Sequence, residues 1–151
     1  MTDTLSPAQR AEEIDASRQR LTDFIQGCTE AQWESSPVEG DPRPVGVITD
    51  HVAHAYEYLA GWITEILSGG SPHVDGELVD DLNAGHAASG AVPTQAQVTD
   101  HLKSSGDVLI TLVGGLEQAQ LELGDGRVDR FAMIAARHAD SHREEIQENL
   151  G

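Results

Sequence analysis

Residues 45–67 read VGVITDHVAHAYEYLAGWITEIL, a run of the chain without a proline. Its apolar residues recur at the three- and four-residue spacing that places side chains on one face of a helix. The members of this apolar face are Ile48, Val52, Ala55, Leu59, Trp62, Ile63 and Ile66. Gly69, Gly70 and Pro72 come directly after the run and are typical of a helix end. The pattern therefore predicts one long amphipathic helix from Val45 to Leu67.

Three further long helices are predicted around this one, over residues 6–28, 94–116 and 128–150. Ser6-Pro7 opens the first, because a serine N-cap followed by proline is a common helix start. Thr94 opens the next, since Gln97 three residues later completes a capping-box pattern. The tight-turn signal Gly124-Asp125-Gly126 precedes the last.

The connections between these helices differ in length. A short turn is predicted over residues 29–33, and the proline-rich residues 35–44 indicate a loop. Residues 71–93 are too many for a structureless loop in a compact domain, so a short helix over residues 77–88 is expected there as a lid or lateral helix. Four helices with one long connection between the second and third predict an all-α, antiparallel-type four-helix bundle, built as one domain over residues 1–151.

Composition and charge narrow the function classes. The chain has 151 residues, with 26 acidic and 9 basic side chains and a formal net charge of −17 when histidine is neutral. That charge repels a phosphate backbone and an anionic membrane surface, so neither nucleic acid nor a membrane is expected as a partner. The single cysteine, Cys28, excludes an internal disulfide and fits a small core residue. We recognise no signal peptide and no transmembrane run, and we expect a cytoplasmic protein that acts on a small molecule.

Two of the seven histidines, His138 and His142, lie four residues apart and therefore on one helix face. That face also carries Phe131, Ile134, Ile146 and Leu150. Because these residues are apolar, both imidazoles are expected to point into the bundle. Buried imidazoles need partners, and one metal ion can satisfy both. Surface histidines, or core histidines bonded to hydroxyl or carboxylate groups, are the alternative interpretation.

A third ligand is expected from the second helix, which offers His51 and His54. Helical geometry places His51 about 75° and His54 about 135° from the centre of the apolar face, so His51 is the inward candidate and His54 is expected at a helix seam or in solvent. His101 is expected at the edge of the apolar face of its own helix. His86, in the long connection, could reach the bundle mouth, although loop histidines commonly lie at the surface.

Three histidine ligands on two facing helices would leave a coordination position open for water or substrate, as catalytic metal sites do. Zn²⁺, Ni²⁺ and Fe²⁺ all accept such nitrogen ligands. Nearby carboxylates could orient the ring nitrogens, but solvated positions are expected for them, with Asp140 on the outer face of its helix. These carboxylates are Asp50, Glu57, Asp140 and Glu145. No Glu-x-x-His or His-Glu-x-x-His pattern occurs, which argues against di-iron and zincin sites.

Three segments resemble motifs of the DinB/YfiT-like superfamily of four-helix-bundle metalloenzymes. They are VGVITDHVA at residues 45–53, DLNAGHA at residues 81–87 and RHADSHREEI at residues 137–146. The resemblance implies a divalent metal ion held by His51, His138 and His142, the same three histidines that helix geometry selects. The presence of His54 leaves a competing ligand on the second helix.

The resemblance also implies a class of chemistry. Some members of this superfamily are metal-dependent S-transferases or isomerases that use low-molecular-weight thiols such as mycothiol or bacillithiol. The leading hypothesis is therefore a divalent-metal-dependent enzyme with mycothiol or another low-molecular-weight thiol as cosubstrate. Two alternatives remain: a non-catalytic helical binding module whose histidines are structural, and a metal-dependent hydrolase that activates water.

Self-association is expected as well. Trp33, Val38 and the long connection have no evident partner in a four-helix core, and unpartnered apolar residues often mark interfaces. Members of the resembling superfamily are often dimers, so the resemblance agrees. We expect a homodimer formed through helix faces away from the mouth of the metal site. The alternative is a monomer whose Trp33 loop folds onto the end of the bundle.

Overall fold

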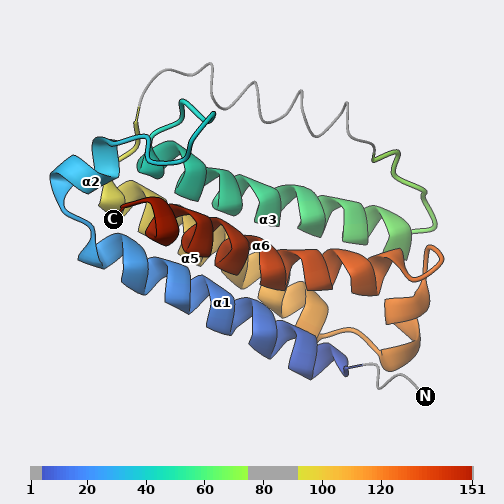
Figure 1. The fold of residues 1–151 in the computed structure, drawn as a ribbon. Coiled ribbons are helices and arrows are strands. Elements are labelled where there is room, and N and C mark those ends of the chain that lie inside the picture. Colours follow the sequence, from blue (N-terminus) through green and yellow to red (C-terminus); the bar gives the residue numbers. More distant parts are fainter. Residues whose placement is uncertain (1–4, 75–91, 151) are drawn as a thin grey trace.

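The computed structural model describes residues 5–74 and 92–150 (Figure 1). Its elements are α1 (Pro7–Gly27), α2 (Glu30–Glu34), α3 (Val45–Leu67), α5 (Gln95–Gly114), the 3₁₀ helix η1 (Gln118–Glu122) and α6 (Arg127–Leu150). The residues so described contain no strand, and α1, α3, α5 and α6 form a bundle, so the predicted all-α four-helix architecture is confirmed. The short helix predicted over residues 77–88 lies outside the described residues.

Three of the helices begin with the same local arrangement. Ser6, Thr29 and Thr94 are the N-caps of α1, α2 and α5, and each is followed three residues later by a glutamine. In each case the hydroxyl of the N-cap accepts a hydrogen bond from the backbone N–H of the glutamine. The glutamine side chain in turn accepts a hydrogen bond from the backbone N–H of the N-cap residue. These reciprocal bonds satisfy amides that a helix start would otherwise leave unpaired, which is why the helices begin at these residues.

The relative directions of the helices differ from those of a bundle in which all neighbours are antiparallel. Asp50 near the start of α3 contacts His101 near the start of α5, so these two neighbours run in parallel. Arg10 near the start of α1 likewise bonds Asp129 near the start of α6. The antiparallel neighbours are α3 with α6 and α1 with α5 (Figure 1). The long connection between α3 and α5 explains the difference, because it leads the chain back to the end of the bundle where α3 began.

The core is aliphatic, as the small number of aromatic residues requires, and two expectations about it are wrong. Ile134, expected to face inward, is 41% exposed. Trp33, expected to lack an internal partner, is only 4% exposed, and its indole Nε1 donates a hydrogen bond to the carbonyl of Pro93 at 2.8 Å. The ring packs beside Gly46 at the start of α3. The expected homodimer stays a prediction, but it no longer has an exposed Trp33 to support it.

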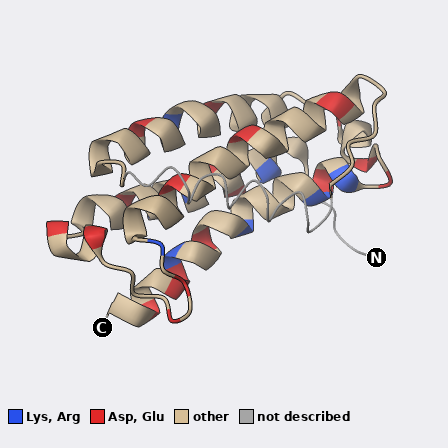
Figure 2. Ribbon diagram, turned by 90° about the horizontal axis from the view of Figure 1, so that it is seen from above, with Lys and Arg blue, Asp and Glu red and all other residues tan. Residues whose placement is uncertain are grey.

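Three of the nine basic side chains join α1 to its neighbours. Two arginines of α1 bind α6 and one binds α5. The pairs are Arg10 with Asp129, Arg20 with Asp140, and Arg18 with Asp107. Acidic positions are spread along the bundle with few basic positions among them (Figure 2). Within the described part of the chain, no helix combines the length and apolar character needed to cross a membrane.

Candidate metal centre

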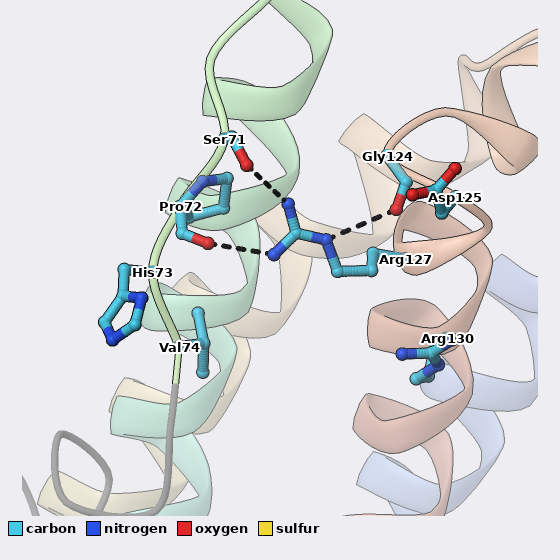
Figure 3. A pocket seen from close by; sticks show the side chains of 8 residues that line it. All are labelled: Ser71, Pro72, His73, Val74, Gly124, Asp125, Arg127 and Arg130. Atoms are coloured by element: carbon cyan, nitrogen blue, oxygen red, sulfur yellow. Dashed lines mark hydrogen bonds between the residues drawn. The ribbon is translucent and has the colours of Figure 1, made fainter.

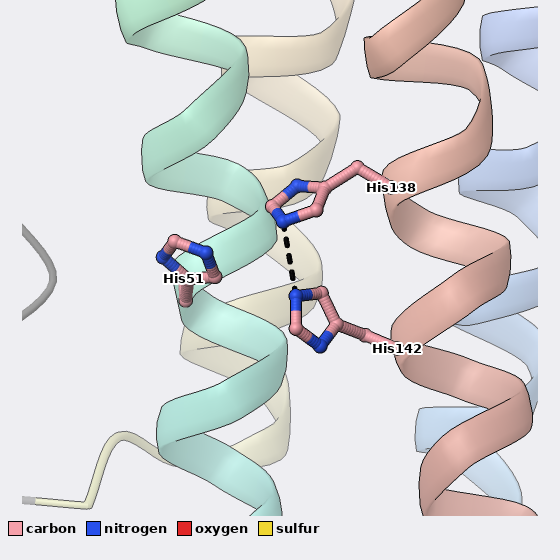
Figure 4. Close-up of side chains that lie close together, drawn as sticks. All are labelled: His51, His138 and His142. Carbon is pink, nitrogen blue, oxygen red and sulfur yellow. Dashed lines mark hydrogen bonds between the residues drawn. The ribbon is translucent and has the colours of Figure 1, made fainter. Parts of the chain in front are cut away.

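Three imidazoles from two antiparallel helices meet between α3 and α6 (Figure 4). His51 lies in the second turn of α3 and is 8% exposed. His138 and His142 lie one turn apart on α6 and both point toward His51. The predicted inward orientation of these three residues is therefore what the structure shows.

The ring nitrogens are close enough to share one ion. The Nε2 atoms of His138 and His142 are 2.9 Å apart. The ring centroid of His51 lies 4.9 Å from that of His138 and 5.4 Å from that of His142, with the rings nearly perpendicular in both pairs. One nitrogen from each ring lies within 4.8 Å of the other two. Histidine nitrogens bind Zn²⁺ at about 2.0–2.1 Å, so such a cluster needs only small side-chain movements to enclose an ion.

Burial favours the neutral form of two of these imidazoles, His138 and His142. Loss of solvent lowers the pKa of His138 to about 4, with smaller contributions in the same direction from His142 and Arg43. Burial is also the largest cause of the lowered pKa of His142, and Arg43 again acts in this direction while Glu145 opposes it. A neutral imidazole offers a lone pair, which is the state that a metal ion needs. The buried Nδ1 of His138 has no hydrogen-bond partner among the described residues.

Arg43 brings a positive charge to the edge of this cluster. It lies in the loop that leads into α3, and its guanidinium forms a bidentate pair with Asp41, with Nη2 at 2.8 Å from Oδ2. The pair lowers the pKa of the Asp41 carboxyl, so the guanidinium keeps its partner at neutral pH. Sequence analysis missed Arg43. The available signal was its position between Pro42 and Pro44, directly before the helix that carries a histidine of the cluster.

The neighbouring carboxylates divide into two groups. Glu145 approaches the cluster, with Oε1 4.0 Å from Nδ1 of His142. Asp140 turns away from it and receives two hydrogen bonds from Arg20 at 2.9 and 2.7 Å and one from Arg143 at 3.4 Å. The outward placement of Asp140 is therefore correct, but it binds arginines between α1 and α6 instead of being freely solvated.

The remaining described histidines lie elsewhere. His54 lies at the seam of α3 and α5, one of its two expected positions, and meets His101 there at a centroid distance of 4.7 Å. His73 lines an open hollow of about 460 Å³ near the start of α6 (Figure 3). Arg127 in that hollow donates to the carbonyls of Pro72 and Gly124, so its guanidinium joins two segments of the chain. His86 lies outside the described residues.

The comparisons with known proteins give one match. A family model described as the DinB superfamily matches residues 13–146, which include all three histidines of the cluster. No curated protein and no solved structure matches the chain significantly.

Proposed function

The chain belongs to the DinB superfamily, and from that premise we propose that it is a divalent-metal-dependent enzyme whose ion is held by His51, His138 and His142. The observation that carries the proposal is the convergence of three largely buried imidazoles from two helices. Buried polar groups need partners, and an ion between the rings would satisfy all three at once.

The electrostatics of the site favour this proposal over a purely structural role for the histidines. The lowered pKa values of His138 and His142 favour the uncharged form of both rings, in which each imidazole carries a single N–H. Without an ion, two facing Nε2 atoms at 2.9 Å require that one of them carry a proton and donate it to the other. With an ion, both can present lone pairs to it.

Three protein ligands leave at least one coordination position for a small molecule, as in catalytic sites. The chemistry that a divalent ion would supply here is a lower pKa for a bound thiol or water, which would make the anionic nucleophile available at neutral pH. Arg43 at the edge of the cluster adds a positive charge that favours the same anionic form. Asp41 fixes the guanidinium in place through its bidentate pair.

Within this class, we propose thiol S-transfer with mycothiol or another low-molecular-weight thiol as cosubstrate, as the superfamily resemblance implies. The thiol would lose its proton to solvent, and its sulfur would form a bond to an electrophilic carbon of the second substrate. The leaving group would depart from that carbon with the bonding electron pair. The three histidines would position the sulfur, and Arg43 would stabilise its negative charge.

The test begins with the untagged chain, because a histidine tag binds the same metals. Elemental analysis after purification should find at least one transition-metal ion per chain. A panel of electrophiles is then assayed with and without low-molecular-weight thiols, mycothiol included. Turnover that requires both metal and thiol is expected. Metal-dependent turnover without any thiol would overturn S-transfer in favour of hydrolysis, and a chain that binds no Zn²⁺, Ni²⁺ or Fe²⁺ would overturn the whole proposal.

The matched variants are His142→Phe and His73→Phe. Both remove one imidazole and keep a ring of similar size, but His73 is exposed and far along the chain from the cluster. Loss of metal and activity in the first variant, with both retained in the second, is the expected result. Equal metal content in the two variants would contradict the ligand assignment.

A further inference from the structure

A second cluster of ligand-type side chains lies on the other side of the same helix turn. Asp50, His54 and Glu57 are spaced four and three residues apart, so they form one stripe of α3. This stripe faces α5, which contributes His101. Asp50 and His51 are consecutive residues, and they therefore direct their side chains to two different helices, one to α5 and the other to α6.

Each of the two carboxylates approaches both imidazoles. Asp50 uses one oxygen toward His101 Nδ1, at 2.8 Å, and the other toward His54 Nε2, at 3.2 Å. Glu57 Oε1 contacts the remaining ring nitrogen of His101 and lies 3.8 Å from Nδ1 of His54. Ligand atoms of Asp50, His54 and His101 all lie within 4.8 Å of one another. Two imidazoles and one carboxylate therefore lie at the distances of a metal site, with the carboxylate of Glu57 beside them.

We propose that Asp50, His54 and His101 form a second divalent-metal site, for a first-row transition-metal ion, at the seam of α3 and α5, with Glu57 bonded to the other ring nitrogen of His101. Two neutral imidazoles and one or two carboxylates are a ligand set typical of Zn²⁺, Fe²⁺ and related ions. Two carboxylates carry two negative charges, which one divalent ion neutralises. Neither the family match nor the three-histidine cluster assigns this site.

The surroundings of His101 favour a cation. Its ring lies between two carboxylates, with Asp50 at one ring nitrogen and Glu57 at the other. Their negative charges attract a positive ion to this position. Solvent reaches the cluster through an open hollow of about 380 Å³ that Glu57 and His101 line, so an ion can enter without unfolding the seam.

The experiment titrates the metal-stripped, untagged chain with Zn²⁺ alone at mildly alkaline pH, where protons compete least with the metal ion. Calorimetry and elemental analysis should give two ions per chain. The double variant His54→Gln, His101→Gln should bind one, and so should His138→Phe, His142→Phe, which removes the other centre. Glu57→Gln, a change at a half-exposed position, should weaken only one of the two binding events, by about tenfold or more.

Histidine ¹⁵N NMR of the wild-type chain supplies a readout that does not depend on the folding of any variant. The imidazole resonances of His54 and His101 should shift when Zn²⁺ is added, and they should still shift in His138→Phe, His142→Phe. Failure of the three-histidine centre therefore leaves this result unchanged. Resonances of His54 and His101 that do not shift on addition of Zn²⁺, whatever the number of ions bound by the wild type, would overturn the second site and leave a hydrogen-bonded network around His101.

Discussion

The Nε2 atoms of His138 and His142 face each other at 2.9 Å across one turn of α6. Two imidazoles in this arrangement cannot both point lone pairs at each other, so either a proton or a metal ion lies between them. Burial lowers the pKa of both rings, which disfavours added protons and leaves lone pairs for a metal ion. This relationship leads to the first two predictions.

Metal binding should raise the thermal stability of the wild-type chain. An ion that binds only the folded state at about 100 times its Kd stabilises it by about 2.7 kcal/mol. For a domain of this size that corresponds to an increase in Tm of about 5–10 °C. The variant His142→Phe should lose the part of this increase in Tm that comes from the three-histidine cluster, whereas His73→Phe should show the same increase in Tm as the wild type. Differential scanning calorimetry with and without chelator measures this, and an equal shift in both variants would contradict the prediction.

The metal-free chain should lose stability as the pH is lowered, because of His138. Its pKa is about 4 in the folded chain against 6.5 for an ordinary imidazole. As pH falls through this interval the unfolded chain takes up a proton that the folded chain does not, so stability present above pH 6.5 is lost toward pH 4. The loss from this residue is on the order of 2–3 kcal/mol.

The control for this pH dependence is His138→Phe, which removes the titrating group. His101 acts in the opposite sense, because its raised pKa adds stability as pH falls. The comparison is therefore made between wild type and variant at each pH, by urea unfolding in the presence of a chelator. Parallel stability curves for the two chains between pH 6.5 and 4 would show that His138 does not have its lowered pKa.

The sequence predicted the features that depend on local spacing. Helix bounds followed from N-caps and glycines, and α3 spans the predicted residues 45–67. The turn at residues 124–126 has a positive φ at all three positions, which the glycine-rich pattern anticipated. The inward orientation of His51 and of the pair on α6 followed from helix phase alone, because a period of 3.6 fixes which side chains share a face.

Features that depend on contacts between distant segments were not predictable in this way. Arg43 reaches the histidine cluster from a loop, and no periodicity describes a loop. His101 and Asp50 are 51 residues apart, so their pairing appears only once α3 and α5 lie in parallel. The exposure of Ile134 has a related cause. Its helix, α6, packs on both α1 and α3, and the positions of those two helices decide which side of α6 is left open to solvent.

The glycine at the start of α3 should be intolerant of a larger residue. A Cβ at Gly46 would lie 2.8 Å from Trp33 Cε2 and 2.8 Å from Val92 Cγ1. The indole cannot move easily, because it is buried and bonded to the Pro93 carbonyl. Gly46→Ala should therefore lower the free energy of unfolding by about 1–3 kcal/mol.

Gly61→Ala is the matched substitution in the same helix. A Cβ there has no neighbour within 4 Å, so the change should stabilise the chain by about 0.5–1 kcal/mol through helix propensity. Urea unfolding of both variants measures the difference. Stabilisation by Gly46→Ala comparable to that by Gly61→Ala would show that Trp33 is not held against α3.

The last prediction concerns the charge beside the cluster. Arg43 lowers the pKa of His138 and of His142, in addition to the larger effect of burial. Arg43→Gln should therefore raise the pKa of both imidazoles in the metal-free chain, as measured by histidine NMR titration. In the metal-loaded chain the same variant should bind an anionic ligand such as azide more weakly, because a nearby positive charge has been removed.

This variant also leaves the negative charge of Asp41, which already acts on His142, without its arginine partner. The double variant Arg43→Gln, Asp41→Asn removes both charges and separates the two effects. The histidine pKa values should rise most in the single variant and less in the double variant, since the freed carboxylate stabilises the imidazolium only in the former. An unchanged pKa of His142 in the single variant would show that the guanidinium does not act on the cluster, and the role of Arg43 in stabilising an anionic nucleophile would then be lost as well.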